Sequence, residues 1–320
     1  MRSIQQYTDI INSTIANIDY PEYLPNLYDP IRYALSGGGK RLRPMLLLAV
    51  NDAFGGEIEH AVWPAAGIEI FHNFTLVHDD VMDNADLRRG RPTVYKKWGV
   101  NTAILSGDTM TTMAYKCMAG CQPQFLPEVI DRFSMMTMNV YEGQQIDAEF
   151  ETRSDVSFDE YIRMIVGKTA ALIAYPSAIG ALLAGASQHD MDMIFNFGVS
   201  LGIAFQIMDD YLDVYGDIAT FGKEIGGDIL NDKKTWLHIF ANDHDENGVF
   251  KILISEKLSP KVKIEKVTAF YDSLNLREEG KKLINKYTDD ALGYLDSTSM
   301  SGEGKKWLND FALRLMKRDK

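Results

Sequence analysis

Two long apolar stretches of this sequence end in the same acidic pattern, and this repetition constrains the fold more than any other feature. The first runs over 62–83 and ends in DDVMD, and the second runs over 199–213 and ends in DDYLD. On one face of each stretch, residues recur every three or four positions, which is the spacing of an α-helix. The first face comprises Ile68, His72, Thr75, Asp79 and Asp83, and the second comprises Gly202, Gln206, Asp209 or Asp210, and Asp213. Each stretch therefore predicts a helix whose apolar stripe ends in carboxylates.

The rest of the chain follows the same helical spacing. Apolar residues recur at three- and four-residue intervals around 43–50, 62–81 and 194–215, while alternating, strand-like runs are scarce. Polar breaks separate these segments at 36–41, 84–92, 151–159, 216–234 and 296–304. No Gly/Ser-rich linker or solenoid-length repeat divides the chain. We expect an all-α fold of many helices in a single domain over 1–320.

Composition restricts the function and the compartment. A formal net charge of −12 argues against a nucleic-acid-binding protein, which needs a basic surface. The two cysteines, Cys117 and Cys121, lie one helical turn apart without a His or further Cys nearby, which favours reduced structural thiols in a cytoplasmic protein over a metal site. The N-terminus has no basic stretch followed by an apolar run, so no signal peptide is expected.

One segment tests the expectation of a chain without a membrane span. Residues 169–189 carry no charge, and their length approaches that of a membrane-crossing helix. Pro176 and two glycines interrupt the segment, and its apolar residues are mostly alanine. We therefore expect a buried helix pair in a thick helical core rather than a membrane span.

The paired acidic helix ends predict a metal site. Carboxylates at positions i and i+4 of a helix project to the same side, and two such helices facing each other would present oxygen ligands to a hard divalent cation. Mg²⁺ keeps several waters and shares its shell with substrate phosphates, so few protein ligands are needed. A single DDxxD is weak evidence, but two matches with one physical rationale are stronger. The alternative interpretation is two solvated acidic helix ends.

Short basic segments beside glycines suggest a bound polyanion. They supply Lys40 and Arg43, Arg88 and Arg89, Lys168 with Thr169, and Lys223. No P-loop is present, because Ile162 stands where VGKT would need its first glycine and Arg41 stands where GGGK would need Ser or Thr. Bases and Mg²⁺ opening into an apolar interior indicate a diphosphate ester with a hydrocarbon tail. Since no Ser or Cys nucleophile with a base is apparent, the expected chemistry is ionisation to a carbocation.

These segments together resemble the trans-polyprenyl (isoprenyl) diphosphate synthases. The resemblance runs from about residue 32 to 235 and rests on GGKRLRP, HNFTLVHDDVMDNADLRRGRPT, LSGDTM, GQQIDAEF, GKTA, FQIMDDYLDVYGD and GKEIGGDI, which occur in the family's order. It implies the isoprenoid synthase fold, a many-helix bundle around a deep central cavity, in a homodimer. It also implies the condensation of isopentenyl diphosphate with an allylic diphosphate of five to fifteen carbons.

The resemblance assigns a role to each site residue. Three Mg²⁺ ions, with Mn²⁺ as a substitute, would bind to both aspartate motifs: Asp79, Asp83 and Asp209 directly, with Asp80, Asp210 and Asp213 in support. The allylic diphosphate would be held by Arg88, Lys168 and Lys223, and isopentenyl diphosphate by Lys40, Arg43, His72 and Arg89. Gln206 and Thr169 would face the allylic cation, and the released diphosphate would take the final proton.

Product length in this family is set one helical turn before the first motif, here at Phe74 and Thr75. An aromatic beside a small residue, together with a first motif that lacks a two-residue insertion, predicts an all-trans C20 product, with C15 second. Thr75 lies on the Asp79 face and Phe74 about 100° away, so the floor could instead be formed by Thr112, Met113 and Tyr115.

Three other functions share some of these sequence features. A class I terpene cyclase shares an aspartate-rich motif, but it would carry an N-D-x-x-S-x-x-x-E motif in place of DDYLDVYGD and would lack the GGGKRLRP turn. A non-catalytic subunit of a heteromeric synthase would have degraded aspartate motifs. An acidic Ca²⁺-binding helical protein is the third. The basic C-terminal LMKRDK is expected to fray rather than to cover the substrates.

Overall fold

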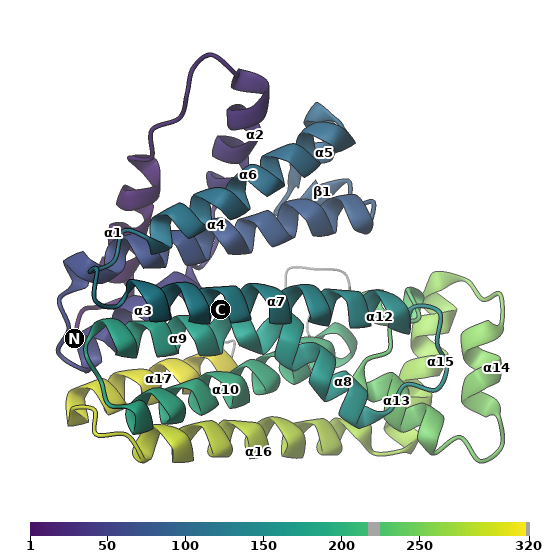
Figure 1. Cartoon of the computed structure of the whole chain (residues 1–320). Helices are drawn as coiled ribbons and strands as arrows, with labels where there is room; N and C mark the ends of the chain where they lie inside the picture. The colour runs from purple at the N-terminus through teal and green to yellow at the C-terminus, as the bar shows by residue number, and fades with distance from the viewer. Residues whose placement is uncertain (217–224, 318–320) are drawn as a thin grey trace. The chain divides into compact units, whose positions relative to one another are not determined.

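The computed structural model describes residues 1–216 and 225–317, and these are helical apart from turns, loops and one short hairpin (Figure 1). The all-α class expected from the sequence is confirmed. The chain divides into two compact units, each made of several segments. Unit 1 comprises 1–135, 175–194 and 299–306, and unit 2 comprises 136–174, 195–298 and 307–320, of which 217–224 and 318–320 are not described. That the chain is a single domain over 1–320 stays a prediction.

Unit 1 contains the N-terminal helices and the hairpin. Its elements are α1 (Ile4–Ala16), α2 (Pro25–Leu35), α3 (Leu42–Ala53), α4 (Ile58–Met82), β1 (Leu87–Arg88), β2 (Arg91–Pro92), α5 (Val94–Trp98) and α6 (Val100–Met118). Local sequence sets several helix starts: Ser3 and Gln6 form a capping box before α1, and Pro25 opens α2.

Helices α4 and α6 pack side by side in unit 1 (Figure 1). Small residues permit this close approach, because a Cβ on Gly67 of α4 would lie 2.9 Å from the carbonyl oxygen of Ala114. Toward the other end of α6, Gly107 leaves room for the ring of His78, which also contacts the Ile104 carbonyl through Nε2 at 3.1 Å. Helix α6 thus contacts α4 from Gly67 to His78, one residue before the first aspartate motif.

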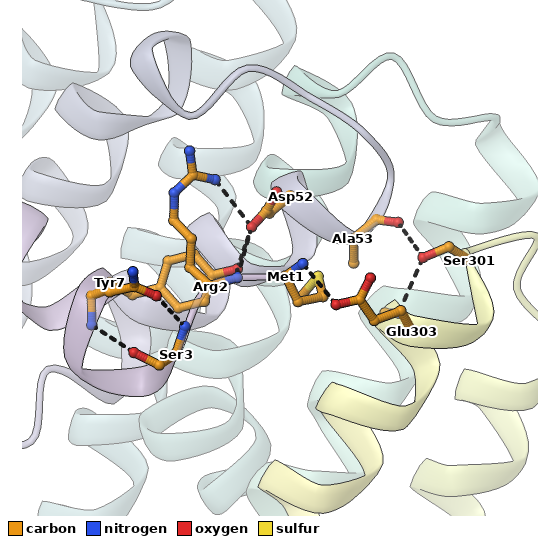
Figure 2. Close-up of polar contacts among 10 residues, drawn as sticks. Met1, Arg2, Ser3, Tyr7, Asp52, Ala53, Ser301 and Glu303 are labelled. Carbon is orange, nitrogen blue, oxygen red and sulfur yellow. Dashed lines mark hydrogen bonds and ion pairs between the residues drawn. The ribbon is translucent and has the colours of Figure 1, made fainter.

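The first residues of the chain are fixed to α3 and to the first turn of α17 (Gly302–Lys317) by polar contacts (Figure 2). The terminal ammonium of Met1 lies 3.0 Å from Glu303, and Arg2 lies 3.1 Å from Asp52. The buried phenol of Tyr7 also donates to Asp52 at 2.6 Å. Burial alone would raise the pKa of Asp52, but these hydrogen bonds outweigh it and lower the pKa below its usual value.

Unit 2 contains most of the C-terminal helices. Its elements are α8 (Phe158–Ile165), the π-helix η1 (Val166–Ala170), α12 (Gly227–Leu230), α13 (Trp236–Asp243), α14 (Val249–Ser255), α15 (Pro260–Ser273) and α16 (Leu276–Asp296). The boundary between the units falls within α7 (Leu126–Phe150), α9 (Ala171–Leu183), α10 (Gln188–Tyr215) and α17. Trp236 is fully buried, and Gly280 leaves room for its indole, since a Cβ there would approach the ring to 2.7 Å.

The uncharged segment 169–189 forms the end of η1, the whole of α9 and the start of α10. Pro176 does not interrupt α9, and the break falls instead after Leu183, where Gly185 adopts a positive φ of 74°. By length and composition, the helical stretches Phe158–Leu183 and Gln188–Tyr215 could each cross a membrane, although 78% and 56% of their most apolar windows are buried within the protein. Such burial is typical of core helices as well.

The hairpin is the one described departure from the predicted helices and loops. Arg89 and Gly90 both have positive φ, 52° and 72°, and they join β1 to β2 in a two-residue turn. The sequence predicted only a polar break over 84–92, because strands of two residues are too short to show a two-residue hydrophobic period.

Candidate active site

The first aspartate motif lies at the C-terminal end of α4. Asp80 is buried with 3% of its surface exposed, Asp79 is half-buried, and Asp83 is exposed and caps the helix. The helix dipole places partial negative charge at this end, so three carboxylates here require cations nearby. Arg88 supplies one, since its Nε and Nη2 both lie 2.8 Å from Asp80 Oδ1. Burial nevertheless keeps the pKa of Asp80 above its ordinary value, with Arg88 opposing the shift.

The hairpin aims Arg89 at the glycine-rich turn. Arg88 and Arg91 pair across the two strands, so Arg89 occupies the tip, and its guanidinium donates to the carbonyl of Gly38. A Cβ on Gly39 would lie 3.0 Å from that guanidinium, and Gly39 has a φ of 131°. Lys40 follows the turn and is exposed. The tip of the hairpin thus lies against the glycine-rich turn that precedes Lys40.

Arg43 and His72 form a contact between α3 and α4. Arg43 Nη1 lies 3.2 Å from His72 Nε2. Burial, with Arg43 and Arg89 nearby, lowers the pKa of His72 well below its ordinary value, so the imidazole is neutral. Burial also lowers the pKa of Arg43 to about 10, which leaves it charged at neutral pH. Because arginine only donates, Nε2 accepts and the ring proton lies on Nδ1.

This pair has donors that the protein does not satisfy. Among the described residues, the buried atoms Arg43 Nε and His72 Nδ1 have no hydrogen-bond partner. A buried donor without an acceptor costs about 1–3 kcal/mol, so such groups usually await a ligand or water. Two of them beside Arg89 suit an anion.

A buried ion pair supports the start of α3. Arg41 has a φ of 48°, and its Nη1 lies 2.5 Å from Glu69 of α4. The same guanidinium donates to Asn12 and to the Leu35 carbonyl, and Asn73 donates to Glu69 at 2.8 Å. The sequence reasoning missed this network. The available signal was Glu69 itself, a lone acid within an apolar helix, because buried acids are nearly always paired.

The two predicted product-length residues lie on different faces of α4. Phe74 is buried, with its ring centroid 5.3 Å from that of Phe71 and 4.7 Å from that of His78. Thr75 is half-buried, and its hydroxyl donates to the His72 carbonyl. Of the residues predicted as an alternative floor, Thr112 is exposed, Met113 is half-buried, and Tyr115 donates to Ser134.

The second aspartate motif lies at the C-terminal end of α10, in unit 2. Asp210 is 2% exposed, and both of its oxygens accept hydrogen bonds: Tyr161 donates to Oδ2 at 2.6 Å and Gln206 donates to Oδ1 at 2.9 Å. Burial raises the pKa of Asp210 to about 7. Asp209 is half-buried. Asp213 accepts the backbone N–H of Asp228 at 2.9 Å, which ties the start of α12 to the motif.

The π-helix η1 brings Lys168 and Thr169 to the same region of unit 2. Gly202 of α10 packs directly on Ala170, since a Cβ there would lie 2.5 Å from the Ala170 Cα. Thr169 can therefore donate to Gln206 Oε1 at 3.0 Å, and a chain of hydrogen bonds runs from Thr169 through Gln206 to Asp210. Inserted π-turns of this kind are common at functional sites.

A pocket in unit 2 combines predicted and unpredicted residues. Its lining includes Asp147, Tyr161, Lys168, Thr169, Gln206, Asp210 and Lys233. Asp147 lies in the GQQIDAEF segment, but no role was predicted from the sequence for Asp147 or for Lys233. Burial would lower the pKa of Lys233, but the carboxylates of Asp210, Asp228 and Asp147 together outweigh it and raise the pKa above its ordinary value. Lys223, predicted for the allylic diphosphate, lies outside the described residues.

Comparison with known proteins identifies the family of this chain, which the geometry of the site alone does not. The family model described as polyprenyl synthetase matches residues 24–272. The chain belongs to the polyprenyl synthetase family. The recognition made from the sequence is therefore confirmed, and so is the expected activity class: the chain is a trans-prenyltransferase.

Individual family members agree with this assignment. The chain is 42% identical to a geranylgeranyl diphosphate synthase of Sulfolobus acidocaldarius over 240 residues, which are 74% of this chain and 71% of that protein. A crystal structure of a geranylgeranyl pyrophosphate synthase matches with a TM-score of 0.95 and 39% identity over 100% of both chains. Another, from Corynebacterium glutamicum and complexed with isoprenyl diphosphate and magnesium, matches with a TM-score of 0.83 and 29% identity over 98% and 96% of the two chains. These matches confirm the isoprenoid synthase fold.

Proposed function

We propose that this protein condenses isopentenyl diphosphate with an allylic diphosphate in a Mg²⁺-dependent reaction and makes an all-trans C20 diphosphate. The observation that carries the proposal is the Arg43–His72 contact, which has two unsatisfied buried donors that no aspartate of the first motif occupies. A terpene cyclase binds one diphosphate and has no use for a second basic site. A synthase needs one for isopentenyl diphosphate.

Isopentenyl diphosphate would be held in unit 1. Arg43 Nε and the Nδ1 proton of His72 would donate to its phosphate oxygens, and Lys40 and Arg89 would add charge. The neutral state of His72 matters here, because its Nε2 is already occupied by Arg43 and its Nδ1 carries a proton to donate. The ring therefore orients the anion without serving as a base. The Arg41–Glu69 pair would hold the turn in place.

The aspartate motifs fit a hard divalent cation. Their ligands are carboxylate oxygens, which Mg²⁺ prefers. Asp80 and Asp210 accept hydrogen bonds from Arg88, Tyr161 and Gln206, which supports a secondary role for them. Asp79, Asp83 and Asp209 are the proposed direct ligands. Within 1–216 and 225–317, no three His, Cys, Asp or Glu side chains are close enough to hold a metal ion alone. This favours ions that share their shell with substrate phosphates, and the proposed number is three, with Mn²⁺ as a substitute.

Bound Mg²⁺ would stabilise the charge of the departing diphosphate. The chain's own residues would bind and orient the allylic substrate. Lys168, Arg88 and Lys223 would hold the allylic diphosphate, and the Thr169–Gln206–Asp210 chain would fix the Gln206 amide oxygen toward the allylic carbon. The carbon–oxygen bond of the allylic substrate breaks, C4 of isopentenyl diphosphate bonds to the allylic carbon, and a C2 proton passes to the released diphosphate.

The C20 product is supported by relatives named geranylgeranyl diphosphate synthase, although relatives named for C15 and C25 products also match. Phe74 is proposed as the stop, since its buried ring contacts those of Phe71 and His78. We further propose a cytoplasmic homodimer without a membrane span. Apolar side chains exposed on α6, namely Val100, Ile104 and Leu105, support self-association.

Product analysis by mass spectrometry tests the proposal. The purified protein is incubated with Mg²⁺ and C5, C10 or C15 allylic primers, with and without isopentenyl diphosphate. We expect C20 diphosphate from every primer only when isopentenyl diphosphate is present. A hydrocarbon or alcohol formed without it would indicate a cyclase instead. Inactivity that a partner protein reverses would indicate a non-catalytic subunit.

A further inference from the structure

Two glycines let α7 and η1 touch through their backbones in unit 2. A Cβ on Gly143 would overlap the backbone nitrogen of Lys168, and a Cβ on Gly167 would lie 2.6 Å from the carbonyl oxygen of Asn139. Asp147 follows Gly143 by one helical turn, so the two share a face of α7. The close packing therefore presents Asp147 to the π-helix rather than to solvent.

Asp147 contacts the ammonium of Lys168. Lys168 Nζ lies 2.5 Å from Asp147 Oδ2, and the two side chains are 30% and 20% exposed. Both line the pocket that also contains Gln206, Asp210 and Lys233. The contact is thus half-buried, where a charge-assisted hydrogen bond is stronger than at an open surface.

We infer that Asp147 is a positioning residue that holds Lys168 toward the allylic diphosphate. A lysine has three N–H donors on a flexible four-carbon stem, and ordering that stem costs conformational entropy when it grips a ligand. With one donor held by Asp147, the stem is ordered in advance and two donors remain for phosphate oxygens. The inference rests on the proposed role of Lys168 in diphosphate binding.

A rival hypothesis predicts the opposite change in diphosphate affinity when Asp147 is removed. If Asp147 acted only as a negative charge beside the pocket, it would repel a diphosphate, and its removal would tighten binding. If it positions Lys168, its removal weakens binding, and the weakening depends on Lys168. Affinity for inorganic pyrophosphate in the presence of Mg²⁺ separates the two and needs no turnover.

The experiment compares wild type with D147N, K168M and the double variant by calorimetric titration of Mg²⁺–pyrophosphate. We expect D147N to weaken binding about tenfold, as removal of an orienting partner commonly does at metal-dependent sites. In the K168M background, D147N should change the affinity less than about twofold, because coupled residues are non-additive. The control is E149Q, since Glu149 lies on the same helix, is exposed and accepts a hydrogen bond from Gln145.

Steady-state kinetics provide a second reading. D147N should raise KM for the allylic diphosphate and leave KM for isopentenyl diphosphate within about twofold, because the weakened contact is local to one diphosphate. If D147N does not fold, D147E moves the carboxylate by one methylene and should weaken pyrophosphate binding about threefold.

The inference would be overturned if D147N or D147E bound pyrophosphate as tightly as wild type or more tightly. It would also be overturned if D147N weakened binding equally with and without Lys168. Failure of the proposed function is seen separately, because wild-type protein would then bind Mg²⁺–pyrophosphate without elongating any primer.

Discussion

Tyr161 of α8 donates its phenolic proton to Asp210 of α10 over 2.6 Å, and both side chains are almost completely buried. The contact joins two helices of unit 2 directly behind the second aspartate motif. Gln206 donates to the other carboxylate oxygen, Oδ1, so the two donors together satisfy both oxygens of Asp210. The carboxylate of Asp210 is therefore held in the core of unit 2 at the second aspartate motif.

Replacement of Tyr161 by Phe removes this donor and leaves a buried carboxylate oxygen unsatisfied. We expect Y161F to lower the free energy of unfolding by about 1–3 kcal/mol. Urea denaturation followed by circular dichroism measures the change. The matched control is Y294F, because Tyr294 is 36% exposed on α16 and should tolerate the loss of its hydroxyl. Equal stability of Y161F and wild type would contradict the structural role assigned to this contact.

Arg43 is expected to determine the affinity for isopentenyl diphosphate. R43Q removes a charge-assisted donor and should raise KM for isopentenyl diphosphate about tenfold to a hundredfold, with KM for the allylic substrate nearly unchanged. Initial rates with each substrate varied in turn give both constants. R32Q is the control, since Arg32 forms an exposed pair with Asp29 at 2.8 Å. Equal increases in both constants would mean that Arg43 does not distinguish the two diphosphates.

Phe74 is expected to limit product length. F74A opens space beside Phe71 and His78 and should shift the product from C20 to longer chains, at a cost in stability of about 3 kcal/mol. Mass spectrometry of the products and a thermal melt record the two effects. An unchanged product distribution from a folded F74A protein would exclude Phe74 as the stop and direct attention to Thr75 and to α6.

His238 gives the protein a defined dependence on pH. Burial, with Lys234 nearby, lowers its pKa from 6.5 to about 4 in the folded state. The unfolded chain therefore binds the proton more readily between these values, and stability falls as the pH drops from 6.5 toward 4. The loss reaches at most about 1.4 kcal/mol per pH unit. H238N should flatten this slope in urea denaturation performed at several pH values, whereas an unaltered slope would assign the dependence to other groups.

Removal of divalent metal is expected to abolish turnover and leave the helices folded. Chelation with EDTA should stop product formation, Mg²⁺ should restore it, and Mn²⁺ should do so in part. D83N, which changes an exposed carboxylate, should raise the Mg²⁺ concentration needed for half-maximal activity. Full activity in the presence of EDTA would contradict the metal assignment.

The helical class and the two aspartate motifs could be predicted from the sequence because helical periodicity and a repeated five-residue pattern are local signals. The partners of buried charges could not. Glu69 meets Arg41 across 28 positions and Asp210 meets Tyr161 across 49, and no local pattern encodes either distance. The Arg89–Gly90 turn could not be predicted either, since the strands that it joins are only two residues long. Asp147 lies within the GQQIDAEF segment, but its contact with Lys168 depends on the glycine packing of α7 against η1.

Incorporation of isotopically labelled isopentenyl diphosphate tests the central claim most directly. The protein is incubated with farnesyl diphosphate, Mg²⁺ and fully ¹³C-labelled isopentenyl diphosphate, and the product mass is measured. Condensation predicts a C20 diphosphate that carries one labelled C5 unit. An unlabelled hydrocarbon or alcohol, or recovery of both substrates unchanged from folded protein, would contradict it.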